Sequence, residues 1–237
     1  MFKVIPSSLL VLGLLFFQPN LAIAEIEVDT NTQPQAFEQL QHFANSLNTF
    51  SASFEQVVLS PNGHSGDIVS GTFSLSRPNL FRWDYVGDFP QLIIGDGSKI
   101  WIYDIELEQV SVKAQPQTVE ESPVLLLLQP DSLEQYFTVA DLGVVEGMAL
   151  LSLTPKAVDS AFQRLLIGLR NNMPDLLVLE DGFGQRTEIR FSQQLINQVI
   201  EPAQYIFVIP AGSDVIGDGN AAEDNIENSK ESGLGQP

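Results

Sequence analysis

The side chain best suited to specific chemistry is Arg77, which opens the sequence Arg-Pro-Asn-Leu-Phe-Arg-Trp-Asp. Its guanidinium carries five fixed N–H donors, which suit the carbonyl oxygens at helix ends. Arg77 shares one face of an expected strand with Phe73 and Leu75, so its charge needs acceptors if that face is the interior. The spacing leaves a second interpretation open, in which Arg77 stands at a strand end and points into water.

Side chains that could catalyse a reaction or bind a metal are sparse. The chain has no cysteine, and its two histidines, His42 and His64, belong to no ligand-spaced cluster. No nucleophile elbow, phosphate-binding glycine loop or dinucleotide fingerprint is present. The neighbouring carboxylates Glu120 and Glu121 are interpreted as a solvated surface. The sequence therefore predicts a protein that is not an enzyme and uses neither a metal nor a cofactor.

The stretch after the arginine also supplies an aromatic wall. Phe81, Trp83 and Tyr85 share one face of the expected strand, and Arg82 and Asp84 share the other. Leucines in the run 124–128 cover nearly every direction around a helix, so that helix requires burial. Such residues usually form plain core, and that interpretation remains open. Their combination with one inward arginine favours a closable pocket that holds something apolar.

Periodicity predicts one amphipathic helix followed by many short strands. Apolar residues recur at helical spacing over 34–50. Asp96-Gly97 is a strong hairpin signal, and two short helical segments at 122–128 and 131–136 interrupt the strands. The fold expected from this pattern is mainly β, a barrel or a strongly curved antiparallel sheet. The expected strands span residues 54–59, 68–76, 80–85, 92–94, 99–103, 109–112, 137–141, 148–154, 164–169, 176–180, 186–191 and 205–208.

Both ends of the chain are expected to lie outside the folded domain. Residues 1–24 combine Lys3, an apolar run over 9–17 and an Ala-Ile-Ala cleavage sequence, which predicts a signal peptide and export. Residues 217–237 are acidic and lack apolar periodicity, so we expect a disordered tail. A single domain is therefore expected over 25–216.

The charge balance is strongly acidic. The chain has 30 acidic and 11 basic residues, a formal net charge of −19. This balance predicts repulsion from nucleic acid and from anionic membrane surfaces. The acidity either keeps the protein soluble or faces basic patches on partner proteins, and both interpretations remain open.

Seven motifs, in order along the chain, resemble those of the LolA family of periplasmic outer-membrane lipoprotein carriers. The resemblance runs from about residue 35 to about residue 215 and is most specific before residue 156. The motifs are Ser-Ala-Ser-Phe-Glu-Gln at 51–56, Arg-Pro-Asn-Leu-Phe-Arg-Trp at 77–83, Leu-Ile-Ile-Gly-Asp-Gly at 92–97, Trp-Ile-Tyr-Asp at 101–104, Leu-Glu-Gln at 107–109, Ser-Pro with the leucines at 122–128, and Leu-Thr-Pro-Lys at 153–156.

This resemblance implies an unclosed antiparallel β-barrel with a lid of short helices over a hydrophobic cavity for lipoprotein acyl chains. It implies that Arg77 latches the lid through hydrogen bonds to lid backbone. The lid helix would comprise Pro123, Val124, Leu125, Leu127 and Leu128. The cavity would be lined by Phe54, Phe73, Phe81, Trp83, Leu92, Ile94 and Trp101.

The implied partners are outer-membrane lipoproteins as cargo, an inner-membrane lipoprotein-releasing ABC transporter as donor and an outer-membrane receptor lipoprotein as acceptor. A monomer in the periplasm that binds no nucleic acid is expected. Two alternatives stay open from the residues alone. One is a periplasmic lipid- or lipoprotein-sensing regulatory module on the same type of barrel. The other is a lipid hydrolase, against which the missing nucleophile and base argue.

Overall fold

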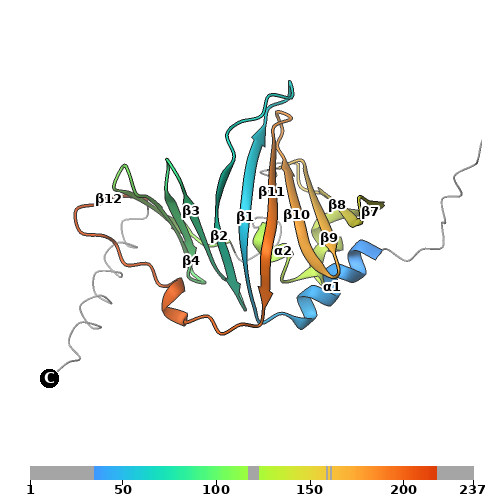
Figure 1. Ribbon diagram of the computed structural model, residues 1–237, viewed down its shortest axis with the longest axis horizontal. Helices are drawn as coiled ribbons and strands as arrows, with labels where there is room; N and C mark the ends of the chain where they lie inside the picture. Colours follow the sequence, from blue (N-terminus) through green and yellow to red (C-terminus); the bar gives the residue numbers. More distant parts are fainter. Residues whose placement is uncertain (1–34, 117–122, 159, 161, 218–237) are drawn as a thin grey trace, which may run out of the picture. The chain divides into compact units, whose positions relative to one another are not determined.

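A computed structural model describes residues 35–116, 123–158, 160 and 162–217 (Figure 1). The expected signal peptide, Glu120, Glu121 and the expected cap Ser122 lie outside the described residues, as does the acidic tail after Gly217. No described helix is both long enough and apolar enough to cross a membrane.

The described chain is built on one large sheet with a few short helices (Figure 1). The helices are α1 Gln35–Ser46, α2 Pro123–Leu126, α3 Leu133–Tyr136 and the 3-10 turns η1 Pro130–Ser132 and η2 Pro202–Tyr205. The strands are β1 Thr49–Leu59, β2 Val69–Ser76, β3 Leu80–Val86, β4 Gln91–Gly95, β5 Lys99–Asp104, β6 Gln109–Ala114, β7 Phe137–Val145, β8 Met148–Pro155, β9 Arg164–Arg170, β10 Met173–Glu180, β11 Arg186–Ile196 and β12 Asp214–Gly217.

The sheet is open, with β12 and β7 as its two edges. The strand order is β12-β6-β5-β4-β3-β2-β1-β11-β10-β9-β8-β7. Neighbouring strands run antiparallel, apart from β12, which pairs with β6 in parallel. The expected mainly β fold with an unclosed sheet and short helices is confirmed.

Several boundaries differ from the sequence-based expectation, and in two places the type of element differs. The first helix ends at Ser46, and Phe50 belongs to β1, where it pairs with Leu75 of β2. This pairing overrides the helical spacing that extended the prediction to residue 50. The strand expected at 205–208 is wrong, because Tyr205 ends a 3-10 turn and the closing strand is β12.

The two faces of the sheet carry different side chains. The inner face, defined here as the face that bears Phe54, Phe73 and Trp83, holds the main hydrophobic core. Helix α1 packs on it through Ala36, Leu40 and the last-turn residues Phe43 and Ala44, at helical spacing. The outer face is the opposite one. Residues 197–213, which we call the C-terminal strap, lead from β11 to β12 at the far edge of the sheet (Figure 1).

Candidate functional site

Arg77 follows directly after β2 and donates three hydrogen bonds to backbone carbonyls. Its Nε donates to Leu47 O at 2.7 Å, and its Nη2 donates to Ala44 O at 2.6 Å and to Leu128 O at 3.1 Å. Ala44 lies in the last turn of α1, where carbonyls have no partner within the helix and the helix dipole is negative. One guanidinium therefore joins the end of α1 to the segment after α2.

The structure agrees in part with each of the two interpretations that the sequence left open for Arg77. The residue does lie at a strand end and is exposed as a whole. Its guanidinium nevertheless bonds to backbone rather than only to water. Hydrogen bonds from a charged donor contribute about 1.5–3 kcal/mol each at most, and exposure to solvent lowers that figure.

The leucines of the second helical segment are fully enclosed. Pro123 and Val124 begin α2, and the four leucines from 125 to 128 are each at most 3 % exposed. The amides of Leu128 and Gln129 both donate to Leu125 O, which continues the turn past the helix end. These leucines join the inner-face core, as expected for a short helix that is apolar on every side.

A cavity of about 230 Å³ lies between this helical segment and the inner face. Of its nine lining residues, eight are aliphatic or aromatic, and Thr187 alone carries a hydroxyl. Leu127 supplies the contact from the lid side. The lining is Phe73, Trp83, Leu127, Leu165, Leu177, Leu179, Thr187, Ile189 and Phe191.

The aromatic rings of Phe73 and Trp83 line one side of this cavity, whereas the expected cavity residues Phe54 and Phe81 belong to the same buried cluster but are not among its lining residues. The Trp83 ring centroid lies 4.2 Å from that of Phe73 and 4.9 Å from that of Phe54, the latter in an edge-on arrangement. Phe81 belongs to the same buried cluster and sits over Gly95, where a Cβ would collide with its ring. Aromatic pairs of this kind add about 0.5–1.5 kcal/mol each beyond their buried area, so the wall is rigid.

The expected cavity residues Leu92, Ile94 and Trp101 lie elsewhere, and their assignment to the cavity is corrected here. Cross-strand pairing sets Ile94 opposite Arg82 and Leu92 opposite Asp84, on the outer face. Ile93 pairs with Trp83 and faces inward instead. A strand reverses its side chains at every residue, so one register decides the face for the whole strand.

Ile94 and Trp101 belong to a second buried cluster, on the outer face, to which the C-terminal strap contributes Phe207. The Phe207 ring of the C-terminal strap stacks on Trp101 at 5.4 Å. The Trp101 Nε1 donates to Asp96 Oδ2 at 2.8 Å. Burial alone would raise the pKa of Asp96, but hydrogen bonds from Trp101, Lys99 and Ser98 outweigh it and lower that pKa below its ordinary value.

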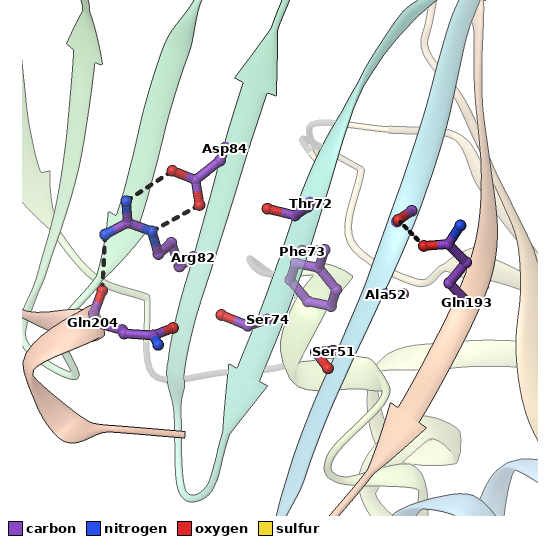
Figure 2. A pocket seen from close by; sticks show the side chains of 10 residues that line it. Ser51, Ala52, Thr72, Phe73, Ser74, Arg82, Asp84, Gln193 and Gln204 are labelled. Carbon is purple, nitrogen blue, oxygen red and sulfur yellow. Dashed lines mark hydrogen bonds and ion pairs between the residues drawn. The ribbon is translucent and has the colours of Figure 1, made fainter. Parts of the chain in front are cut away.

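A shallow polar groove of about 260 Å³ also lies on the outer face, beside the C-terminal strap (Figure 2). Arg82 and Asp84 share it, as the alternation predicted, and form an ion pair at 2.7 Å. Arg82 Nη1 also donates to Gln204 O at 3.0 Å, which fastens the strap to β3. The groove residues bond to one another, so this groove supports the sheet and strap.

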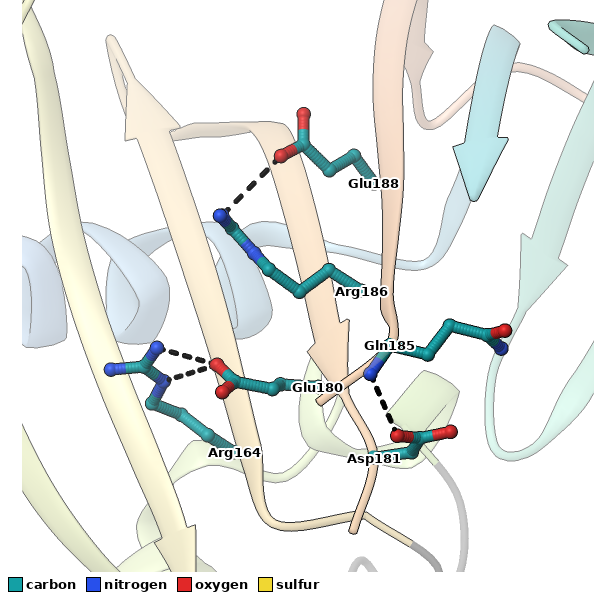
Figure 3. Close-up of polar contacts among 6 residues, drawn as sticks. All are labelled: Arg164, Glu180, Asp181, Gln185, Arg186 and Glu188. Atoms are coloured by element: carbon teal, nitrogen blue, oxygen red, sulfur yellow. Dashed lines mark hydrogen bonds and ion pairs between the residues drawn. The ribbon is translucent and has the colours of Figure 1, made fainter. Parts of the chain in front are cut away.

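Further along the outer face, one ion pair connects β9 with β10, and a second lies within β11 (Figure 3). Arg164 Nε donates to Glu180 Oε2 at 3.0 Å, and Arg186 pairs with Glu188 at 3.3 Å. The side chains of Arg164 and Arg186 are over 40 % exposed, so each pair contributes at most about 1 kcal/mol.

The part of the cavity that comes from β9, β10 and β11 was not predicted from the sequence. Leu165, Leu177, Leu179 and Ile189 lie on successive strands and line the cavity with Phe191. The signal was the alternation of Thr187, Ile189 and Phe191 with charged residues in the strand expected at 186–191; the strand expected at 176–180 is apolar from 176 to 179 and does not alternate. Aliphatic residues in a strand are also typical of ordinary core, so their pattern alone did not distinguish a cavity.

An open sheet with a lidded apolar cavity defines the class of binding proteins for apolar ligands. A family model described as "Outer membrane lipoprotein carrier protein LolA" matches residues 45–208. The chain is 44 % identical over 183 residues to an outer-membrane lipoprotein carrier protein of Dechloromonas aromatica, covering 77 % of this chain and 88 % of the relative. This chain belongs to the LolA family.

A second relative supports the same assignment. The outer-membrane lipoprotein carrier protein of Methylococcus capsulatus is 40 % identical over 187 residues, which is 79 % of this chain and 89 % of the relative. Among solved structures, the LolA superfamily protein NE2245 from Nitrosomonas europaea overlays with a TM-score of 0.42 at 11 % identity, covering 73 % of this chain and 97 % of that one. That overlay is distant, so family membership stands on the sequence matches.

Proposed function

We propose that this protein carries lipoproteins across the periplasm and shields their acyl chains in the cavity on the inner face. The lidded apolar cavity, in a chain of the LolA family, is the observation that supports this function most directly. Each buried CH₂ group contributes about 0.8 kcal/mol, so a ligand with several acyl chains needs such a host to leave a membrane. No observation favours the sensing module over the carrier.

The cavity must widen before it can take a whole lipoprotein anchor. Its volume of about 230 Å³ lies below the roughly 300–1,000 Å³ of typical ligand pockets. Leu127 and its neighbours stand over the cavity, and Arg77 bonds to Leu128 O. That contact has to break before the segment that ends at Leu128 can move away from Arg77. Arg77 is therefore proposed as the latch, and the leucines of the lid as the moving part.

The proposed donor is an inner-membrane lipoprotein-releasing ABC transporter, and the proposed acceptor is an outer-membrane receptor lipoprotein. The carrier itself needs no nucleotide, because cargo moves to whichever site binds acyl chains more tightly. The lipoprotein remains chemically unchanged throughout, since the carrier only buries and releases it.

Release from spheroplasts tests the carrier function. Purified protein added to energised spheroplasts is expected to appear in the soluble fraction bound to inner-membrane lipoproteins. Mass spectrometry of the cargo is expected to find its acyl chains intact. A soluble fraction without lipoproteins would reject the carrier, and cargo that had lost a chain would indicate a hydrolase.

A further inference from the structure

A polar pair interrupts the apolar inner face beside the cavity. The Tyr85 hydroxyl on β3 donates to Gln56 Oε1 on β1 at 3.0 Å. Gly71 of β2 lies between the two strands and pairs with Tyr85. A Cβ at Gly71 would collide with the carbonyl oxygen of Asp84 on β3 and would come 2.9 Å from the Phe54 ring. The glycine therefore permits the close approach of β2 and β3, and it places no side chain between Tyr85 and Gln56.

The pair stands at the border of the cavity, at the end away from Arg77. Gln56 pairs in register with Ile189, and Tyr85 follows two residues after Trp83 on the same face; both neighbours line the cavity. Gly71 precedes Arg77 by six positions along β2, and strands rise about 3.3 Å per residue. About 20 Å of the inner face thus separates the polar pair from the proposed latch.

The hydrogen bond fixes which groups of Gln56 remain for a ligand. Tyr85 uses the amide oxygen, and among the described residues the Gln56 amide nitrogen has no partner. Burial raises the pKa of Tyr85, so the phenol stays protonated and keeps donating. The NH₂ group of the Gln56 amide therefore remains, and its two N–H donors can bind carbonyl oxygens.

We propose that Gln56, positioned by Tyr85, hydrogen-bonds the ester or amide carbonyls that join the acyl chains of a lipoprotein to its head. This inference rests on the proposed carrier function. It places the carbonyl end of the acyl chains at the end of the cavity beside Gln56. Half of a bilayer's hydrocarbon core is about 15 Å thick, which is the depth one acyl chain fills. Chains that start at Gln56 therefore fit within the 20 Å or so before Arg77.

Matched ligands with and without carbonyls test the assignment. The probes are a synthetic dipalmitoyl glyceryl-cysteine peptide with ester links and its dialkyl ether analogue with chains of equal length. Each displaces a fluorescent fatty acid from the full-length protein. One neutral hydrogen bond predicts that the ester form binds roughly three- to tenfold more tightly.

The variants Gln56→Met and Tyr85→Phe are expected to bring the ester-to-ether ratio close to one. Tyr103→Phe, which changes a tyrosine that packs against Phe207 on the outer face, is expected to keep the wild-type ratio. A wild-type ratio of one, or a ratio that survives Gln56→Met, overturns the inference while leaving the carrier function intact. If neither probe displaces the fatty acid, the carrier function falls with it.

Discussion

At the residue scale, Arg77 joins the end of α1 to the segment after α2 through three hydrogen bonds to backbone carbonyls. Arg77→Leu removes all three carbonyl contacts, and if Arg77 is the latch proposed above, the lid is expected to open more readily and to lose its coupling to release. We expect the variant to load lipoproteins but to deliver them at least tenfold more slowly to liposomes that bear the receptor. The control Arg164→Leu removes an exposed ion pair and is expected to deliver at the wild-type rate. Normal delivery by Arg77→Leu would reject the latch.

Asp96 gives a prediction about pH. Its pKa lies below the ordinary value in the folded protein, so it adds stability above the unfolded pKa near 4 and loses that contribution as pH falls through the folded pKa. Asp96→Asn is expected to lower the free energy of unfolding by about 1–2 kcal/mol at pH 7 and by less at pH 3. Urea unfolding at both values measures the difference. The exposed Asp88→Asn serves as control, and an equal loss at both pH values would contradict the mechanism.

At the element scale, the sequence was most informative where one pattern repeats. The alternation over 80–85 correctly placed Trp83 inward and Arg82 outward. The same reasoning failed for Ile94, because its face depends on the register between β3 and β4, and register is not visible within one strand. The parallel pairing of β12 with β6 was equally hidden, since the C-terminal strap joins strands far apart in sequence.

The lid and the sheet should differ in their contribution to global stability. Leu127 and Leu151 are both almost fully buried, but Leu127 belongs to the short lid segment and Leu151 to β8. We expect Leu151→Ala to lower the free energy of unfolding by about 2–5 kcal/mol. Leu127→Ala is expected to cost less than about 2 kcal/mol, because a lid can detach before the sheet unfolds. Urea unfolding compares them, and equal losses would mean that lid and sheet unfold as one unit.

At the scale of the whole molecule, the open sheet explains how one chain can be both stable and adjustable. Eleven strand pairs hold the sheet together, but β7 and β12 do not pair with each other. A closed barrel would fix the size of its interior through strand number and stagger. An unclosed sheet has no such constraint, so the proposed lid movement does not require strand pairs to break. The arrangement suits a host whose cavity is small when empty and larger when loaded.

The net charge of −19 is also a property of the whole molecule. The effect of ionic strength on the delivery rate distinguishes its two interpretations. If the acidic surface meets a basic receptor, screening will slow their encounter: raising the ionic strength from about 0.01 M to about 0.5 M is expected to reduce the delivery rate to receptor liposomes roughly tenfold or more. Binding of a free fatty acid in the cavity involves no such encounter and is expected to stay unchanged or strengthen. Delivery that does not respond to salt would leave solubility as the role of the acidity. Removing residues 218–237, which carry five acidic residues and one basic residue, then shows how much of any salt response comes from the tail.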